Sequence, residues 1–205
     1  TYLLENDLLR NMDLGGTTAS AIMDGDMPAV PQSDDEILRE HGTLTDIGAV
    51  DGAGEDPGVL DELYGNGLRL YFTVLDENGS GSLVLPDGYG FDKLAAWLAE
   101  RQDAYLVIPV SGDDINVLKT LKMLYPDICG RVFPMIGDLG DHVKVEYQGF
   151  RRIMLDLGAL SGIDAGNLSA FLDRNRIAGA YLPEGRSLDG QLLEVLESRN
   201  ITVLK

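Results

Sequence analysis

Several acidic side chains stand at or just after the ends of predicted strands. As a group, such carboxylates could line one mouth of a barrel and bind a cation, because hard oxygen ligands suit Ca²⁺ and Mg²⁺. Taken singly, each is more often a helix cap or a turn residue. The residues are Asp76, Asp87, Asp138, Asp156 and Glu184.

Asp156 is the most informative of these residues, because it interrupts the otherwise apolar run IMLDLG. Burying an unpaired carboxylate is costly, so this position predicts a functional group. Two structural explanations stay open, namely an ion pair with Arg152 and a side chain that faces outward. Tyr181 lies in a later predicted strand and could hydrogen-bond in the barrel mouth, although core packing is the commoner use of such a tyrosine.

Residues that commonly carry catalysis are few. His41 precedes Gly42 in a segment predicted to be surface helix, and His142 is predicted to be a solvated or capping residue at the start of a weak helix. Cys129 is the only cysteine, so neither a disulfide framework nor a thiolate metal site is expected. We interpret it as a small core residue.

The chain is strongly acidic, with 34 acidic and 16 basic residues and a formal net charge of −18. Such a surface repels phosphate backbones and anionic membranes, so nucleic-acid binding is not expected. Cations or basic partners suit it better, although a solvated acidic surface is the commoner explanation of such a composition. No apolar run approaches the roughly 20 residues of a membrane span, and no signal peptide is visible. A leader or anchor could precede Thr1, so extracellular, membrane-anchored and cytoplasmic locations all stay open.

The segment 104–136 indicates the architecture. It opens with an apolar run over 104–110, typical of a strand buried on both faces. A helix follows, with Asp113 and Asp114 at its predicted N-cap and apolar residues along one face. Residues 131–136 are predicted to be a second buried strand. This β-α-β unit implies a right-handed crossover between parallel strands.

The same alternation runs from residue 44 to the end of the chain. Further strands are predicted over 44–50, 68–75, 152–157, 178–182 and 201–204. Further helices are predicted near 60–64 and over 91–101, 142–148, 167–174 and 187–199. Seven strands that alternate with helices predict either an α/β barrel or a doubly wound sheet. No GxGxxG or Walker-type loop follows any strand, which favours the barrel, one strand short of eight.

Several segments of this sequence resemble the glycerophosphodiester phosphodiesterase family, whose members fold as a (β/α)8 barrel of TIM type. They resemble in particular a divergent bacterial branch of that family. The resemblance covers residues 44–205. The segments are IGAVDG followed by LDELYGNGLRLYFTVLDENGSGSLV, then YLVIPVSGDDINVLKTLKMLYPDICGRVFPMI, and finally NRIAGAYLPEG with the predicted helix and the segment ITVLK that follow it.

The resemblance implies phosphodiester hydrolysis, in which carboxylates hold a divalent cation and two histidines act as general base and acid. The matching positions of this chain are changed. The family's Glu-x-Asp pair falls on Leu70 and Phe72, and its histidines fall near Asp46 and Pro86. Pro109, Ser111, Met135 and Lys205 of this chain match the other positions at which the family has polar residues. Because an apolar strand end cannot bind a metal, the resemblance implies a barrel that has lost catalysis, and we assign it no metal ligand and no cofactor.

The N-terminal residues offer the helix and strand that this barrel lacks. A helical pattern over 3–14 ends at Gly15-Gly16, and a short apolar strand follows over 19–23. We therefore predict a circularly permuted single domain, because barrel termini lie close together. In it, residues 1–24 close the barrel, 25–43 form a polar linker with a turn of surface helix at 35–40, and 44–205 form the main body. The alternative is that residues 1–43 are an unrelated extension.

Two functional interpretations follow from these patterns. The first is a non-catalytic module that binds an unknown small molecule or protein through a mouth formed by Phe72, Pro109, Met135, Asp156 and Tyr181. The second is an active hydrolase of glycerophosphodiesters that uses a rearranged set formed by Asp46, Asp51, Asp156 and Lys205, with Ca²⁺ or Mg²⁺ as its cation. A scaffold domain within a longer secreted or membrane-anchored protein is compatible with either. An open barrel edge would favour a homo-oligomer.

Overall fold

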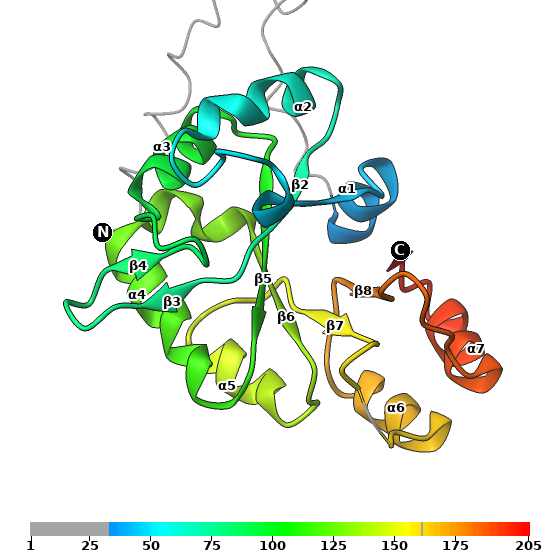
Figure 1. Cartoon of the computed structure of the whole chain (residues 1–205). Helices are drawn as coiled ribbons and strands as arrows, with labels where there is room; N and C mark the ends of the chain where they lie inside the picture. Colours follow the sequence, from blue (N-terminus) through cyan, green and yellow to red (C-terminus); the bar gives the residue numbers. More distant parts are fainter. Residues whose placement is uncertain (1–32, 161) are drawn as a thin grey trace, which may run out of the picture. The chain divides into compact units, whose positions relative to one another are not determined.

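Seven short parallel strands form the centre of the fold, and they follow one another in chain order. The computed structural model describes residues 33–160 and 162–205. The order of the strands in the sheet is β1-β2-β5-β6-β7-β8-β9, and helices lie outside the strands that they connect (Figure 1). Alternation of strand and helix in this order makes the fold an α/β barrel of TIM type, as the sequence predicts.

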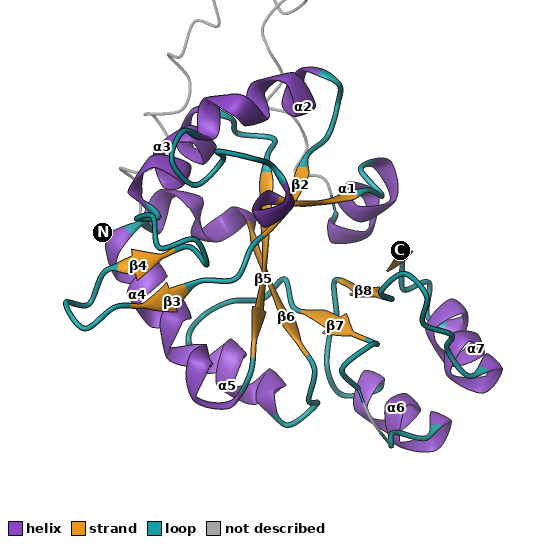
Figure 2. Ribbon diagram, viewed as in Figure 1, coloured by secondary structure: helices purple, strands orange, loops and turns teal. Residues whose placement is uncertain are grey.

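The regular elements are short. The barrel strands are β1 (Leu44–Asp46), β2 (Leu70–Phe72), β5 (Tyr105–Val110), β6 (Val132–Ile136), β7 (Met154–Asp156), β8 (Gly179–Tyr181) and β9 (Val203–Leu204). The helices are α1 (Asp34–Glu40), α2 (Asp61–Gly65), α3 (Asp92–Glu100), α4 (Asn116–Leu124), α5 (Asp141–Tyr147), α6 (Ala165–Leu172) and α7 (Gly190–Ser198). Among these described helices, none is long and apolar enough to cross a membrane. Figure 2 also shows the separate antiparallel hairpin of β3 (Asp76–Glu77) and β4 (Leu83–Val84).

The barrel strands carry apolar side chains on both faces, and these side chains belong to two cores. On β5, Leu106 and Ile108 pack with the helices in an outer core, whereas Val107 packs in an inner core. Val107 lies opposite Phe72 of β2 and Phe133 of β6, which also contact the inner core. Because both faces are buried, the strand appears in the sequence as a continuous apolar run instead of an alternating one.

Helix α1 covers the N-terminal end of the barrel. Its Ile37 and Leu38 are 1% and 0% exposed and belong to the inner core. A side chain at Gly179, the first residue of β8, would collide with Leu38, so this close approach requires glycine. Asp35 accepts a hydrogen bond of 2.6 Å from Thr202 Oγ1, directly before β9. The predicted helix is therefore present, but the prediction that it lies on the surface is wrong, because its apolar pair faces the barrel interior.

Local contacts fix the start of α1. Ser33 Oγ accepts the Glu36 N–H at 3.3 Å and the Glu36 carboxylate accepts the Ser33 N–H at 2.8 Å, which is a capping box. Asp34 forms an ion pair of 3.2 Å with Arg152, whose guanidinium lies 5.5 Å from the centre of the Phe133 ring. A helix of seven residues is too short to be stable alone, so these contacts and the inner core hold it.

Two boundaries differ from the sequence-based expectations. The strand predicted over 44–50 ends at Asp46, because the Asp46 side chain accepts the Gly48 N–H at 2.9 Å and starts a 3-10 turn. Asp113 and Asp114 do not cap α4. They lie within a 3-10 turn, Gly112–Ile115, that precedes the helix.

The helix and closing strand predicted within residues 1–24 lie outside the described residues. Within the described part of the chain, β1 and β9 are the two ends of the strand order. The circular permutation therefore stays a prediction.

We expect Leu38→Ala to lower the free energy of unfolding by about 2–4 kcal/mol, because it leaves a cavity at the base of the inner core. Urea unfolding followed by circular dichroism measures this change. Leu193→Ala on α7 is the matched control, since Leu193 is 38% exposed, and it should cost less than about 1 kcal/mol. Equal losses for the two variants would show that α1 does not belong to the cooperative core.

Candidate binding site at the barrel mouth

Five residues singled out from the sequence lie at the C-terminal ends of the barrel strands, where barrel proteins place their functional groups. Pro109 is paired with Met135 across β5 and β6, and Asp156 is paired with Tyr181 across β7 and β8. Phe72, Met135 and Tyr181 contact the inner core. Alternation along β5 and β7 places Pro109 and Asp156 on the same inner face. The fold therefore gathers all five around one mouth, and their role in binding stays a prediction.

Asp156 is half-buried and holds the turn after β7. Its Oδ1 accepts the N–H groups of Gly158 at 2.9 Å and Ala159 at 3.2 Å. Arg152, its expected ion-pair partner, is instead bonded to Asp34 beyond the N-terminal end of the strand. Asp156 Oδ2 has no hydrogen bond within the described residues, so it can accept a donor from a ligand.

Tyr181 lies next to Asp156 and is also half-buried. Its ring packs against the inner core, and its hydroxyl has no hydrogen-bond partner among residues 33–160 and 162–205. Beside the half-buried Phe72 and Pro109, these two groups make a mostly apolar surface with one acceptor and one donor, above the buried Met135. Such a surface suits a ligand that has an apolar part and a few polar atoms.

The residues of the rearranged hydrolase site lie around the mouth, but they do not converge on one point. Asp46 is exposed and caps a turn. Asp51 lines a hollow of about 380 Å³ together with Thr73 and Pro86, whereas Lys205 lines a different hollow of about 430 Å³. In the part of the chain that the structure describes, no group of three or more His, Cys, Asp or Glu side chains is placed to hold a metal ion.

The other acidic residues at strand ends have local structural contacts. Asp87 and Asp138 each accept the backbone N–H two residues further along the chain, at 3.1 and 2.7 Å, as expected for turn-forming aspartates. Asp76 is exposed in the β3–β4 hairpin. Glu184 lines the same hollow as Lys205.

Neither histidine lies at the mouth. His41 follows α1, and its ring centre is 6.4 Å from that of Tyr105, the first residue of β5. His142 is 1% exposed, so the prediction of a solvated or capping residue is wrong. Its ring meets Phe171 edge-on at 5.4 Å, and its Nε2 lies 3.3 Å from the Arg176 carbonyl oxygen. His142 therefore packs α5 against α6 and its following loop.

The contact that holds the loop after β5 was not predicted. Asp141 is 5% exposed, its Oδ2 accepts the Gly112 N–H at 3.1 Å, and its Oδ1 accepts Lys144 Nζ at 2.7 Å. Burial alone would raise the pKa of Asp141, but the bonds from Lys144 and Gly112 outweigh burial and hold the pKa below its ordinary value. The contact joins residues 29 positions apart, so no local pattern reveals it.

We expect Asp141→Asn to lower the free energy of unfolding by about 1–2 kcal/mol near pH 7, because charge-assisted hydrogen bonds are lost. A lowered folded-state pKa means that the stabilisation is present above the unfolded pKa of about 4. It is lost as the pH falls through the folded value.

Denaturant unfolding of the wild type and the variant at about pH 7 and about pH 3 measures this effect, and the difference should shrink at the lower pH. Asp138→Asn is the control, because asparagine can keep the turn bond of Asp138. A difference between wild type and Asp141→Asn that is independent of pH would contradict the assignment.

Comparison with known proteins finds no matching family model and no matching curated protein. Among solved structures, the chain is similar to a candidate glycerophosphodiester phosphodiesterase from Galdieria sulphuraria. The two chains share 9% sequence identity with a TM-score of 0.46, over 78% of this chain and 91% of the other. At this identity and TM-score the similarity is no evidence of a shared activity.

Proposed function

We propose that this chain is a glycerophosphodiester phosphodiesterase-like barrel that has lost the metal ligands and catalytic histidines of the family and acts as a binding or interaction module. The observation that carries the proposal is the apolar character of the inward-facing strand ends. By the resemblance in sequence, Phe72, Pro109 and Met135 match positions where the family's mechanism needs polar groups. Carbon side chains there can neither ligate a cation nor transfer a proton. The permuted order of segments, with residues 1–24 following residue 205 in the family's order, belongs to the same proposal.

The mouth supplies the contacts expected of a binding site. Phe72 and Pro109 are half-buried and offer apolar surface, while Asp156 Oδ2 and the Tyr181 hydroxyl have no hydrogen-bond partner within the described residues and can bond a ligand. The hollow lined by Thr73, Pro86 and Asp51 opens beside the C-terminal ends of β1 and β2. The ligand is a small molecule or a protein segment with one donor and one acceptor beside an apolar part.

The alternative is an active hydrolase of glycerophosphodiesters that uses Asp46, Asp51, Asp156 and Lys205 with Ca²⁺ or Mg²⁺. One observation favours it, namely the free Oδ2 of Asp156 at the end of a barrel strand. Oxygen ligands of this kind suit either cation. Asp46 and Lys205 would have to move toward Asp156, because they line separate parts of the rim.

We expect calorimetric titration of the wild type with CaCl₂ or MgCl₂ to show no saturable binding up to about 1 mM, since fewer than three carboxylates converge on one point within the described residues. We also expect no hydrolysis of glycerophosphodiesters under the same conditions. The variants Asp156→Ala and Asp76→Ala should behave like the wild type. Saturable binding that is lost in Asp156→Ala but kept in Asp76→Ala, together with hydrolysis, would establish the hydrolase instead.

A further inference from the structure

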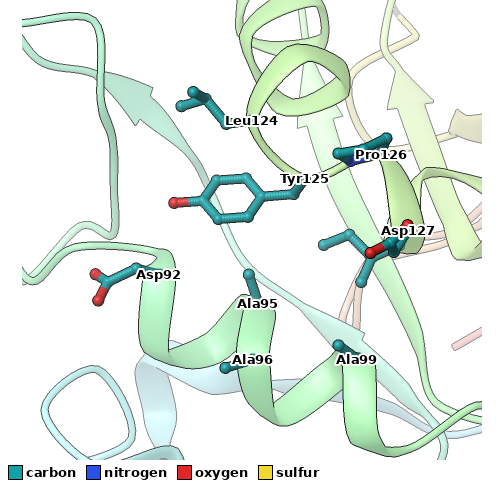
Figure 3. Close-up of a pocket in the computed structure, with 9 residues that line it drawn as sticks. Asp92, Ala95, Ala96, Ala99, Leu124, Tyr125, Pro126 and Asp127 are labelled. Atoms are coloured by element: carbon teal, nitrogen blue, oxygen red, sulfur yellow. The ribbon is translucent and has the colours of Figure 1, made fainter.

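A hollow of about 230 Å³ lies on the outer surface between α3 and the end of α4, away from the barrel interior (Figure 3). Ala95, Ala96 and Ala99 of α3 form one side, and Tyr125 and Ile128 form the other. Three alanines spaced along one helix leave room that larger side chains would fill. The hollow is large enough for one long side chain from another molecule.

The Tyr125 ring is a fixed wall of this hollow. It meets Phe91 edge-on, with ring centres 5.2 Å apart, and the Tyr125 carbonyl accepts a 3.3 Å hydrogen bond from Cys129 Sγ. Burial raises the pKa of the Cys129 thiol, as expected for the core residue that the sequence predicts. An aromatic face held in this way needs no rearrangement to receive a ligand, which lowers the entropic cost of binding.

Two carboxylates flank the hollow. Asp92 and Asp127 are exposed and line it, and neither carboxylate has a hydrogen bond or an ion pair with another described residue. Asp92 lies at the end of the hollow beside the Tyr125 hydroxyl, and Asp127 lies at the opposite end (Figure 3). Burial and the charge of Asp92 both raise the pKa of the Tyr125 hydroxyl. Next to the hollow, Met123 and Leu124 are 69% and 43% exposed. The site therefore combines an apolar floor, an aromatic wall and two unpaired negative charges.

We propose that this hollow binds an arginine side chain from a basic segment of a protein partner, with an adjacent apolar residue of that segment against Leu124. The methylene stem of arginine fits the alanine floor, its planar guanidinium can stack on Tyr125, and its charge can bond Asp92 at the hydroxyl end of the ring. Asp127, at the opposite end of the hollow, is placed for a second basic residue of the same segment (Figure 3). A purely apolar occupant would leave both carboxylates without partners. This inference concerns a surface outside the barrel mouth, so it holds or fails independently of the proposed function.

A short fluorescein-labelled peptide with two Arg-Leu pairs is the probe, and fluorescence anisotropy measures its affinity for the full chain. The matched peptide carries citrulline, which keeps the shape of arginine without its charge. We expect citrulline to weaken binding about tenfold or more, because the charge-assisted contacts of the two arginines with Asp92 and Asp127 are lost. Alanine methyl signals in NMR spectra should shift at Ala95, Ala96 and Ala99 when the arginine peptide is added.

The net charge of −18 attracts any basic peptide, so the variants are matched in charge. The double variant Asp92→Asn with Asp127→Asn should weaken binding about five- to tenfold. The double variant Asp113→Asn with Asp114→Asn, which removes two exposed charges elsewhere, should change it less than about twofold. Ala96→Leu should also weaken binding, because leucine fills the hollow from an exposed helical position.

Three results would overturn the proposal. One is the absence of binding by the arginine peptide, and another is equal binding of the arginine and citrulline peptides. The third is an equal effect of the two double variants, which would show attraction by overall charge alone. Cation titration and hydrolysis at the barrel mouth are separate measurements, so failure here leaves the proposed function untouched.

Discussion

The burial of the inner core is the constraint on which the described part of this protein depends. Seven strands of two to six residues contribute only one to three inward side chains each, too few to fill the barrel from end to end. Ile37 and Leu38 of α1 complete the core at the N-terminal end. The ion pair of Asp34 with Arg152 and the hydrogen bond of Thr202 to Asp35 fix the helix in that place. The helix thus covers the N-terminal end of the inner core with its apolar pair.

The same core shapes the mouth at the other end. Because Phe72 and Met135 continue the apolar interior to the ends of their strands, an unsatisfied carboxylate beside them would be costly. Asp156 avoids this cost by accepting two backbone N–H groups through one oxygen. A mouth of this kind favours binding through apolar contact and a few hydrogen bonds.

Much of the acidic charge also has a local structural use. Asp34, Asp92 and Asp141 lie in the first turns of helices, where negative charge is favoured by the helix dipole. Asp46 and Asp138 accept backbone N–H groups in turns. The strongly negative composition therefore follows in part from capping and turn formation, and it does not by itself indicate a cation site.

The sequence by itself determined the fold class, because strands buried on both faces and amphipathic helices have distinct periods of hydrophobicity. It also placed the mouth residues Phe72, Met135 and Asp156 at strand ends, since chain position along a strand is a local property. It could not show that α1 and His142 are buried, nor that Asp141 holds a loop 29 residues away. Those outcomes depend on which segments meet in space. Only the tertiary structure decides such contacts, because the sequence of a short segment does not show which distant residues it will pack against.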